Sequence, residues 1–203
     1  MVTGVDMLND CTETINYNKA FPRWRGFRQL LNYDETAPIK SVDLTVKKNV
    51  WEDQIVRDNL KRMEEVGCTY DLMMEPNQYP AIFEALETVP NLKVIVDHRG
   101  CRLARPFNLE FLQSQEYLDA MKKFASMPNV FMKISMFGWS DPKWENGDAI
   151  IEETIKLIKL FGPERCMFGT NFPIDCNANM GGWTMKGFVE VFDKICKEFT
   201  PEE

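Results

Sequence analysis

The stretch LKVIVDHRG, residues 92–100, holds a short apolar run of β-branched residues that ends in the polar pair Asp97 and His98. Such a run predicts a buried β-strand whose carboxyl end carries the polar pair. Four comparable runs flank it, at residues 25–31, 70–74, 130–135 and 165–170. Amphipathic stretches separate the five runs. This alternation is typical of parallel βαβ units and predicts an α/β fold.

The stretches between the runs predict helices. Residues 51–66 place their apolar side chains on one helical face and their charged ones on the other. The same pattern recurs at residues 79–87, 116–126, 148–160 and 185–199. Gly67 and Gly162 are expected to end two of these helices. Residues 32–48 show neither period and predict a long loop over the strand ends, and residues 10–18 fit either a short helix or an extended arm.

Composition limits the class of protein. The 203 residues are 44% hydrophobic and 27% charged, which fits one globular domain over residues 1–203. A net charge of −7 and a pI near 5.0 disfavour nucleic acid and anionic membranes as partners. No signal peptide or membrane span is recognisable. The six cysteines lack paired or zinc-type spacing, so we interpret them as reduced thiols of a cytoplasmic protein.

Polar residues gather at the predicted strand ends, where parallel α/β folds bind their ligands. His98 is the only histidine, and a lone histidine is as often a hydrogen-bonded structural residue as a catalytic one. Arg28 is expected to lie on the face of the sheet that points away from the helices. Asp71 is either a carboxylate of the site or an internal ion-pair partner. Lys133 is either an internal ion-pair partner or an exposed residue on a weak strand.

Several other chemistries lack their residues. The sequence holds no nucleophile elbow, phosphate-binding loop or dinucleotide-binding turn. Cys101 has no second histidine to act as its base. A metal needs about three histidine or carboxylate ligands. With one histidine in the chain we predict no metal site in these residues.

Five segments together resemble the amidohydrolase-related TIM-barrel hydrolases, in the branch that contains sugar-lactone and muconolactone hydrolases. They are WRGFRQLLNYDE (24–35), CTYDLMMEPNQ (68–78), LKVIVDHRG (92–100), NVFMKIS (129–135) and FGPERCMFGTNFPID (161–175). The resemblance implies a (β/α)8 barrel of about 250 residues, in which these segments are strands four to eight. The chain is thus expected to be an incomplete TIM barrel of about five βα units, without the opening strands and their His-x-His pair. A divalent metal is implied only for the full-length family.

The resemblance also implies roles for individual residues. His98 matches the histidine that ends the sixth strand, Arg28 matches an arginine that holds a substrate carboxylate or oxyanion, and Gln78 matches a polar residue after the fifth strand. The family's eighth strand ends in Gly-Ser-Asp-Trp-Pro, whose aspartate is a base or metal ligand. Here Asn171 takes its place, and an amide cannot accept a proton as a carboxylate does. Asp175 supplies a carboxylate if the loop folds back, or else it only closes a turn.

Two functions follow. The first is hydrolysis of a lactone or similar cyclic ester of a small acid, with a small molecule as the only partner. Its predicted catalytic residues are His98, Asp175 and Asn171, and its predicted substrate-binding residues are Arg28, Gln78 and Asp71. The second is a non-catalytic, truncated barrel with a binding or structural role. Its unpaired strand edges would favour a homo-oligomer.

Overall fold

The computed structural model describes residues 1–37, 45–177 and 182–202. The chain forms two compact units. Unit 1 contains residues 1–96, 102–105 and 127–130, and unit 2 contains residues 97–101, 106–126 and 131 onward. Six strands form one parallel α/β sheet in chain order, β1-β2-β3-β4-β5-β6. This is the predicted α/β class, with six of the eight strands that a complete barrel has.

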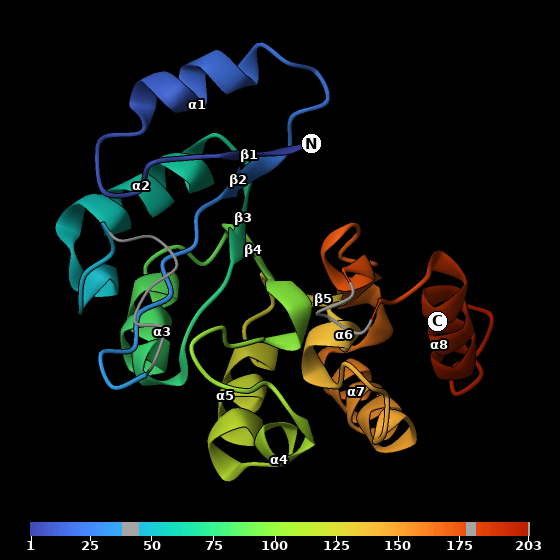
Figure 1. The fold of residues 1–203 in the computed structure, drawn as a ribbon. Coiled ribbons are helices and arrows are strands. Elements are labelled where there is room, and N and C mark those ends of the chain that lie inside the picture. The colour runs from blue at the N-terminus through green and yellow to red at the C-terminus, as the bar shows by residue number, and fades with distance from the viewer. Residues whose placement is uncertain (38–44, 178–181, 203) are drawn as a thin grey trace. The chain divides into compact units, whose positions relative to one another are not determined.

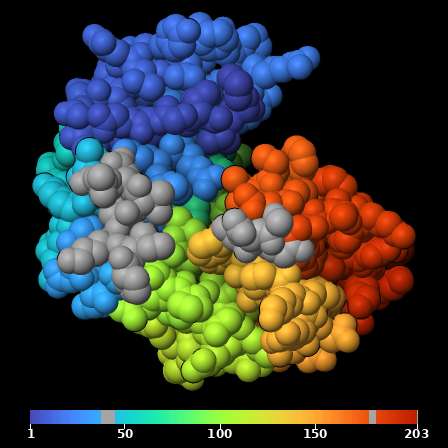
Figure 2. Space-filling view, in the orientation of Figure 1, coloured from blue at the N-terminus to red at the C-terminus, as the bar shows by residue number. Residues whose placement is uncertain are grey.

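Unit 1 is built from parallel strands joined by helices (Figure 1). Its strands are β1 (Val2–Gly4), β2 (Gly26–Arg28), β3 (Thr69–Leu72) and β4 (Lys93–Val96). Its helices are α1 (Thr12–Lys19), η1 (Val50–Glu52), α2 (Gln54–Glu65), η2 (Pro76–Gln78) and α3 (Tyr79–Glu87). Residues 1–22, blue in Figure 2, form an outer surface of this unit that includes the exposed side chains of Tyr17 and Phe21.

Unit 2 contains the later elements. Its strands are β5 (Val130–Ile134), whose first residue belongs to unit 1, and β6 (Cys166–Phe168), which pair in parallel. Its helices are η3 (Asp97–Arg99), α4 (Leu109–Leu112), α5 (Gln115–Ala125), α6 (Phe137–Ser140), α7 (Gly147–Phe161), η4 (Pro163–Arg165), η5 (Ile174–Cys176) and α8 (Met185–Cys196). No helix among the described residues is long and apolar enough to cross a membrane.

The predicted elements are found close to their expected bounds. All five predicted strands form, and the helix predicted at residues 79–87 is α3 itself. Gly67 and Gly162 have φ values of 69° and 87°, as expected of residues that end helices. Residues 12–19 form a helix, so the arm is excluded for them. In the predicted loop 32–48, residues 38–44 lie outside the described residues, and its described parts contain no helix or strand.

The sequence did not predict β1, which adds a strand before the first expected one. Val2, Thr3 and Gly4 pair with Gly26, Phe27 and Arg28 of β2. Three residues are too few for a recognisable alternation, so this strand depends on its pairing with β2. Because loops that follow parallel strands lie at one edge of the sheet, β1 adds a further loop at the edge where ligands bind.

The buried face of unit 1 follows from the two-residue period of strands. Phe27 and Tyr70 are opposite each other in the register and are both fully buried. Trp51 of η1 packs its ring edge against Tyr70, with ring centroids 6.2 Å apart. Burying each large apolar side chain contributes about 1.5–3 kcal/mol. The alternate residues, Arg28 and Asp71, therefore lie together on the opposite face.

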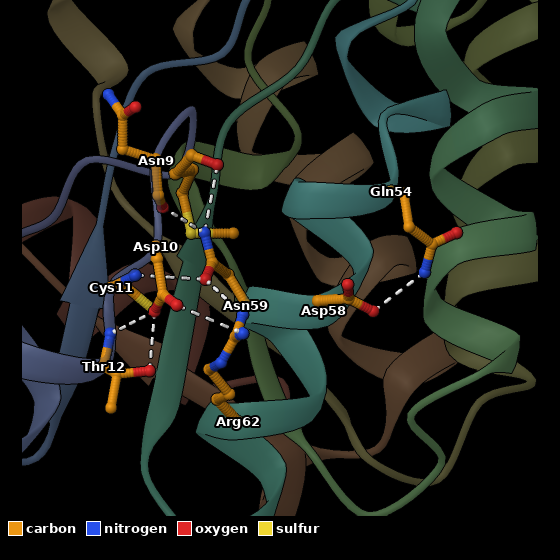
Figure 3. A network of polar contacts seen from close by, with 9 residues as sticks. Asn9, Asp10, Cys11, Thr12, Gln54, Asp58, Asn59 and Arg62 are labelled. Atoms are coloured by element: carbon orange, nitrogen blue, oxygen red, sulfur yellow. Dashed lines mark hydrogen bonds and ion pairs between the residues drawn. The ribbon is translucent and has the colours of Figure 1, made fainter.

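A buried asparagine fixes the loop that follows β1 (Figure 3). Asn59 of α2 is fully buried, and its Nδ2 donates to the carbonyls of Met7 at 3.1 Å and Asn9 at 2.8 Å. Its Oδ1 accepts from Cys11 N and from Arg62. A buried amide that satisfies several backbone groups specifies one loop conformation. Asn59 thus holds residues 7–11 against α2.

Candidate functional site

The predicted substrate-binding pair in unit 1 shares one face of the sheet. Arg28 of β2 and Asp71 of β3 are register partners, so their side chains leave the same face. Asp71 is 4% exposed, whereas Arg28 is half-buried and its Nη2 lies 2.8 Å from Met73 Sδ. The register thus places a carboxylate beside the arginine that was predicted to bind an anion.

Gln78 lies nearby in unit 1 but is occupied by the backbone. Its Nε2 donates to Leu31 O at 2.8 Å, and its Oε1 accepts from Glu75 N at 2.9 Å and Tyr33 N at 3.3 Å. With 7% exposure, this side chain fastens the loop after β2 to the loop after β3. Its role in binding substrate stays a prediction.

Glu75, one of the polar residues that follow the second predicted strand, ties three loops of unit 1 together. It is fully buried, and its Oε1 accepts from Asn32 Nδ2, Leu103 N and Ala104 N at 3.0, 2.8 and 3.1 Å. Burial raises the pKa of this carboxyl, although the three donors oppose the shift. A second tie joins two of the same loops, because Arg105 binds Asp34 at 3.0 Å.

In unit 2 the predicted catalytic histidine is oriented by a serine. His98 is 5% exposed, and its Nδ1 lies 2.7 Å from Ser135 Oγ, at the end of β5. The backbone of His98 is left-handed, with φ 57° and ψ 42°, a conformation that costs a non-glycine residue free energy and often marks a functional site. A hydrogen bond at Nδ1 defines the orientation of the ring and with it the direction of Nε2.

The alternatives for Lys133 are decided in favour of an internal ion pair. Its Nζ lies 2.5 Å from Asp97 Oδ1. The Asp97 side chain is fully buried, whereas that of Lys133 is 24% exposed. Lys133 of β5 and Ser135, the residue directly after β5, both contact the turn that follows β4. A cation and a hydroxyl therefore accompany the histidine at the ends of β4 and β5.

Asn171 and Asp175 contact each other in the loop that follows β6. The loop folds back, as the prediction for Asp175 required, and Asn171 Nδ2 donates to Asp175 Oδ1 at 2.8 Å. Gly138 N of α6 donates to the other oxygen at 3.1 Å. Asp175 is fully buried, and burial raises the pKa of its carboxyl. The shift is in the direction that suits a general base near neutral pH, and a catalytic role for either residue stays a prediction.

The described residues do not form a recognisable metal site. Residues 1–37, 45–177 and 182–202 contain no cluster of three or more histidine, cysteine, aspartate or glutamate side chains that could hold a metal ion. The donor set therefore does not fit a catalytic metal within this part of the chain, and no step of the chemistry below is routed through one.

The chain is similar to known proteins over most of its length. The amidohydrolase family model matches residues 25–184, which is most of the chain. Uncharacterized protein y4mH of Sinorhizobium fredii is 27% identical over 168 residues, covering 82% of this chain and 53% of the relative. L-fucono-1,5-lactonase of Burkholderia ambifaria is 23% identical over 155 residues, covering 75% and 47%. The chain thus spans about half the length of the curated relatives it matches.

Solved structures share the fold. An amidohydrolase from Burkholderia multivorans, crystallised with bound HEPES, superposes with a TM-score of 0.73 at 16% identity and covers 97% of this chain and 66% of its own. The same protein has also been crystallised with bound zinc. A putative 2-pyrone-4,6-dicarboxylic acid hydrolase from Pseudomonas putida gives a TM-score of 0.63 at 17% identity, covering 95% and 72%. Together with the family model over residues 25–184, these likenesses show that the chain belongs to the amidohydrolase family.

Proposed function

We propose that this chain is part of a hydrolase that opens a lactone or a similar cyclic ester of a small acid. The observation that carries the proposal is the contact between His98 and Ser135 at the strand ends of unit 2. Two similar proteins support the substrate class, because a 1,5-lactone and a 2-pyrone are both six-membered cyclic esters. A hydrolase of either kind adds water to an ester carbonyl.

The chemistry needs one proton to move twice. The oxygen of water bonds to the carbonyl carbon, the bond from that carbon to the ring oxygen breaks, and a hydroxy acid is formed. We assign His98 to accept the proton of the attacking water and to return it to the ring oxygen. Ser135 holds the imidazole in place, and Lys133 offers a positive charge to the oxyanion that forms in between.

Within unit 1, taken by itself, we propose that Arg28 binds a carboxylate or another anion, because a guanidinium matches a carboxylate with two parallel donors. Asp71 is its neighbour in the register, and we assign it to orient the guanidinium. Gln78 supports the adjacent loop through its bonds to Leu31 and Tyr33.

The test measures hydrolysis of a panel of sugar 1,5-lactones and 2-pyrone carboxylates by the purified protein. We expect His98→Gln to lower kcat by about a hundredfold or more. Ser135→Ala is expected to lower kcat less. Ser126→Ala is the matched control, because the Ser126 hydroxyl only bonds the Lys123 carbonyl at the end of α5. Activity that survives His98→Gln unchanged would refute the role of His98, and a panel with no hydrolysed ester would refute the proposed function.

A binding or structural role is the second candidate, and an apolar hollow in unit 2 favours it. The hollow has a volume of about 510 Å³ and is lined mainly by apolar side chains beside β6 and α8. Met167 and Phe168 of β6 are 37% and 44% exposed, which is unusual for strand residues of a core. This candidate predicts self-association that increases with concentration in sedimentation experiments. A monodisperse monomer with one cooperative melting transition would contradict it.

A further inference from the structure

Arg99, next to the proposed catalytic histidine, is a buried cation with no carboxylate in ion-pair contact among the described residues, although the charge of Asp175 acts on it from a greater distance. Its side chain is 1% exposed, and no described carboxylate forms an ion pair with it. The guanidinium lies 4.4 Å from the ring centroid of Phe137 and 5.3 Å from that of Phe107. Burial lowers the pKa of Arg99 to about 10, so it remains charged at neutral pH. Burying a charge is costly unless the charge is paired and its donors are hydrogen-bonded.

The side-chain hydrogen bonds of Arg99 reach the turn that follows β5 and the last residue of α6. Its Nε donates to Ser135 O at 3.3 Å, and its Nη2 donates to Met136 O at 3.3 Å and to Ser140 Oγ at 2.5 Å. Its Nη1 has no hydrogen-bond partner. From the other side, Tyr117 donates its hydroxyl proton to Arg99 O at 2.8 Å. The guanidinium therefore holds the carbonyls of the consecutive residues Ser135 and Met136. Tyr117 in turn holds the backbone carbonyl of Arg99.

Both segments that Arg99 joins have strained backbones. His98 and Arg99 have φ values of 57° and 59°, and Met136 has a φ of 63°. Each left-handed non-glycine residue costs about 1 kcal/mol or more and persists only when its surroundings hold it. The turn after β4 and the turn after β5 are thus both held in costly conformations, and Arg99 connects them in addition to the contact between His98 and Ser135.

We propose that Arg99 is a positioning residue that sets the orientation and tautomer of His98 through Ser135. Arg99 fixes the carbonyl of the same residue whose hydroxyl lies 2.7 Å from His98 Nδ1. When this carbonyl moves, the hydroxyl loses its place beside the ring. The importance of Arg99 for catalysis rests on the proposed function of His98, whereas its effect on the ring does not.

Because His98 is the only histidine, its ring can be observed without any assignment problem. Nitrogen-15 NMR of the imidazole reports which ring nitrogen carries the proton. We expect one dominant tautomer in the wild type. Arg99→Met fills the same apolar space without donors and is expected to give a mixture of tautomers. Arg99→Lys keeps the charge and one donor and is expected to restore the wild-type spectrum in part. Ser135→Ala is expected to give the same mixture as Arg99→Met.

Arg165 is a matched control in the same unit. It also donates to two backbone carbonyls, those of Phe161 at 2.8 Å and Ala125 at 3.0 Å, and it lies 5.5 Å from the Phe161 ring. Arg165→Met is expected to lower the melting temperature and to leave the imidazole spectrum unchanged. If Arg99→Met unfolds the protein, Arg99→Lys and Ser135→Ala still test the inference.

Two measurements, the imidazole spectrum and the kinetic constants, distinguish this inference from the proposed function. A spectrum of His98 that is unchanged in the Arg99 variants, or changed equally by Arg165→Met, overturns the positioning role whatever the activity. With an active lactone substrate, Arg99→Met is expected to lower kcat about tenfold or more while KM changes less than about twofold, since proton transfer depends on geometry. If no substrate is hydrolysed while the tautomer shifts as expected, the proposed function fails and the positioning role holds.

Discussion

Asn32 Nδ2 donates to Glu75 Oε1 over 3.0 Å, while Asn32 Oδ1 and Glu75 Oε2 of the same two buried side chains have no hydrogen-bond partner among the described residues. A neutral carboxylic acid carries a hydroxyl that donates a hydrogen bond, so we expect Glu75 to be protonated at Oε2 and to donate to an acceptor such as Asn32 Oδ1. Burial, which raises the pKa of Glu75, favours the same neutral form.

Glu75→Gln is therefore expected to change how stability depends on pH. The folded-state pKa of Glu75 is raised above its unfolded value, so its contribution to the free energy of unfolding is complete below the unfolded pKa and is lost as pH rises through the folded pKa. Glutamine does not titrate, and its amide keeps the donor. Urea unfolding across a pH series is expected to show that the wild type loses stability relative to the variant as pH rises.

The control for this experiment is Glu84→Gln. Glu84 is exposed and pairs with Arg57 at 3.4 Å. Its removal is expected to leave the pH dependence of unfolding close to that of the wild type, because exposed ion pairs contribute little. Parallel curves for the wild type and Glu75→Gln would show that Glu75 is ionised in the folded protein.

Arg28→Met is expected to raise the KM for cyclic esters that carry a carboxylate by about tenfold or more, because a hydrogen bond to a charged group contributes about 1.5–3 kcal/mol. The KM for uncharged lactones is expected to change little. Arg28→Lys is expected to lie between the two, since an ammonium lacks the paired donors of a guanidinium. Equal effects on charged and uncharged esters would exclude anion binding as the role of Arg28.

Asn59→Leu is expected to lower the free energy of unfolding by about 2 kcal/mol or more, because it leaves buried backbone groups unsatisfied. The groups at risk are Met7 O, Asn9 O and Cys11 N, which Asn59 now satisfies. Gln54→Ala on the same helix removes an exposed contact to Asp58, four residues on, and is expected to cost about 0.5 kcal/mol. Chemical denaturation of both variants measures the difference, and equal losses would contradict the role given to Asn59.

Gly26→Ala is expected to destabilise the pairing of β2 with β3. A Cβ at position 26 would lie 2.2 Å from the carbonyl oxygen of Thr69, so the backbone itself must move. Overpacking of this kind costs about 1–3 kcal/mol. Gly4→Ala on β1 meets nothing within 4 Å and is expected to change stability by less than about 0.5 kcal/mol. Thermal unfolding of the two variants checks the contrast, and a tolerated Gly26→Ala would refute it.

Local sequence patterns predicted those strands that contain a run of apolar, β-branched residues. The run at 93–98 is apolar and β-branched, and the strand forms there as Lys93–Val96. The strand Val2–Gly4 has no such signal and exists through its partner strand. The same limit applies to the site. Position after a strand indicated His98 and Arg28, and only the fold reveals that Asp97 pairs with Lys133.

Arg99 illustrates why other residues of the site were missed. Its acceptors are the backbone carbonyls of Ser135 and Met136, 36 and 37 positions away along the chain. Backbone carbonyls exist at every residue, so no residue type in the sequence marks them. The left-handed φ of His98 and Arg99 is equally invisible in the sequence, because any given non-glycine residue adopts it only uncommonly.

Unit 1 is built from separate stretches of the chain, and this affects the order in which its contacts form during synthesis. Asp34 and Glu75 bind residues 103–105, and Asn129 donates to Leu92 O, just before β4, at 2.8 Å. A nascent chain that ends at residue 96 therefore lacks these partners. The loop after β2 gains its contact with Arg105 only after that later residue has been synthesised, so the loop is exposed for longer than the strand before it.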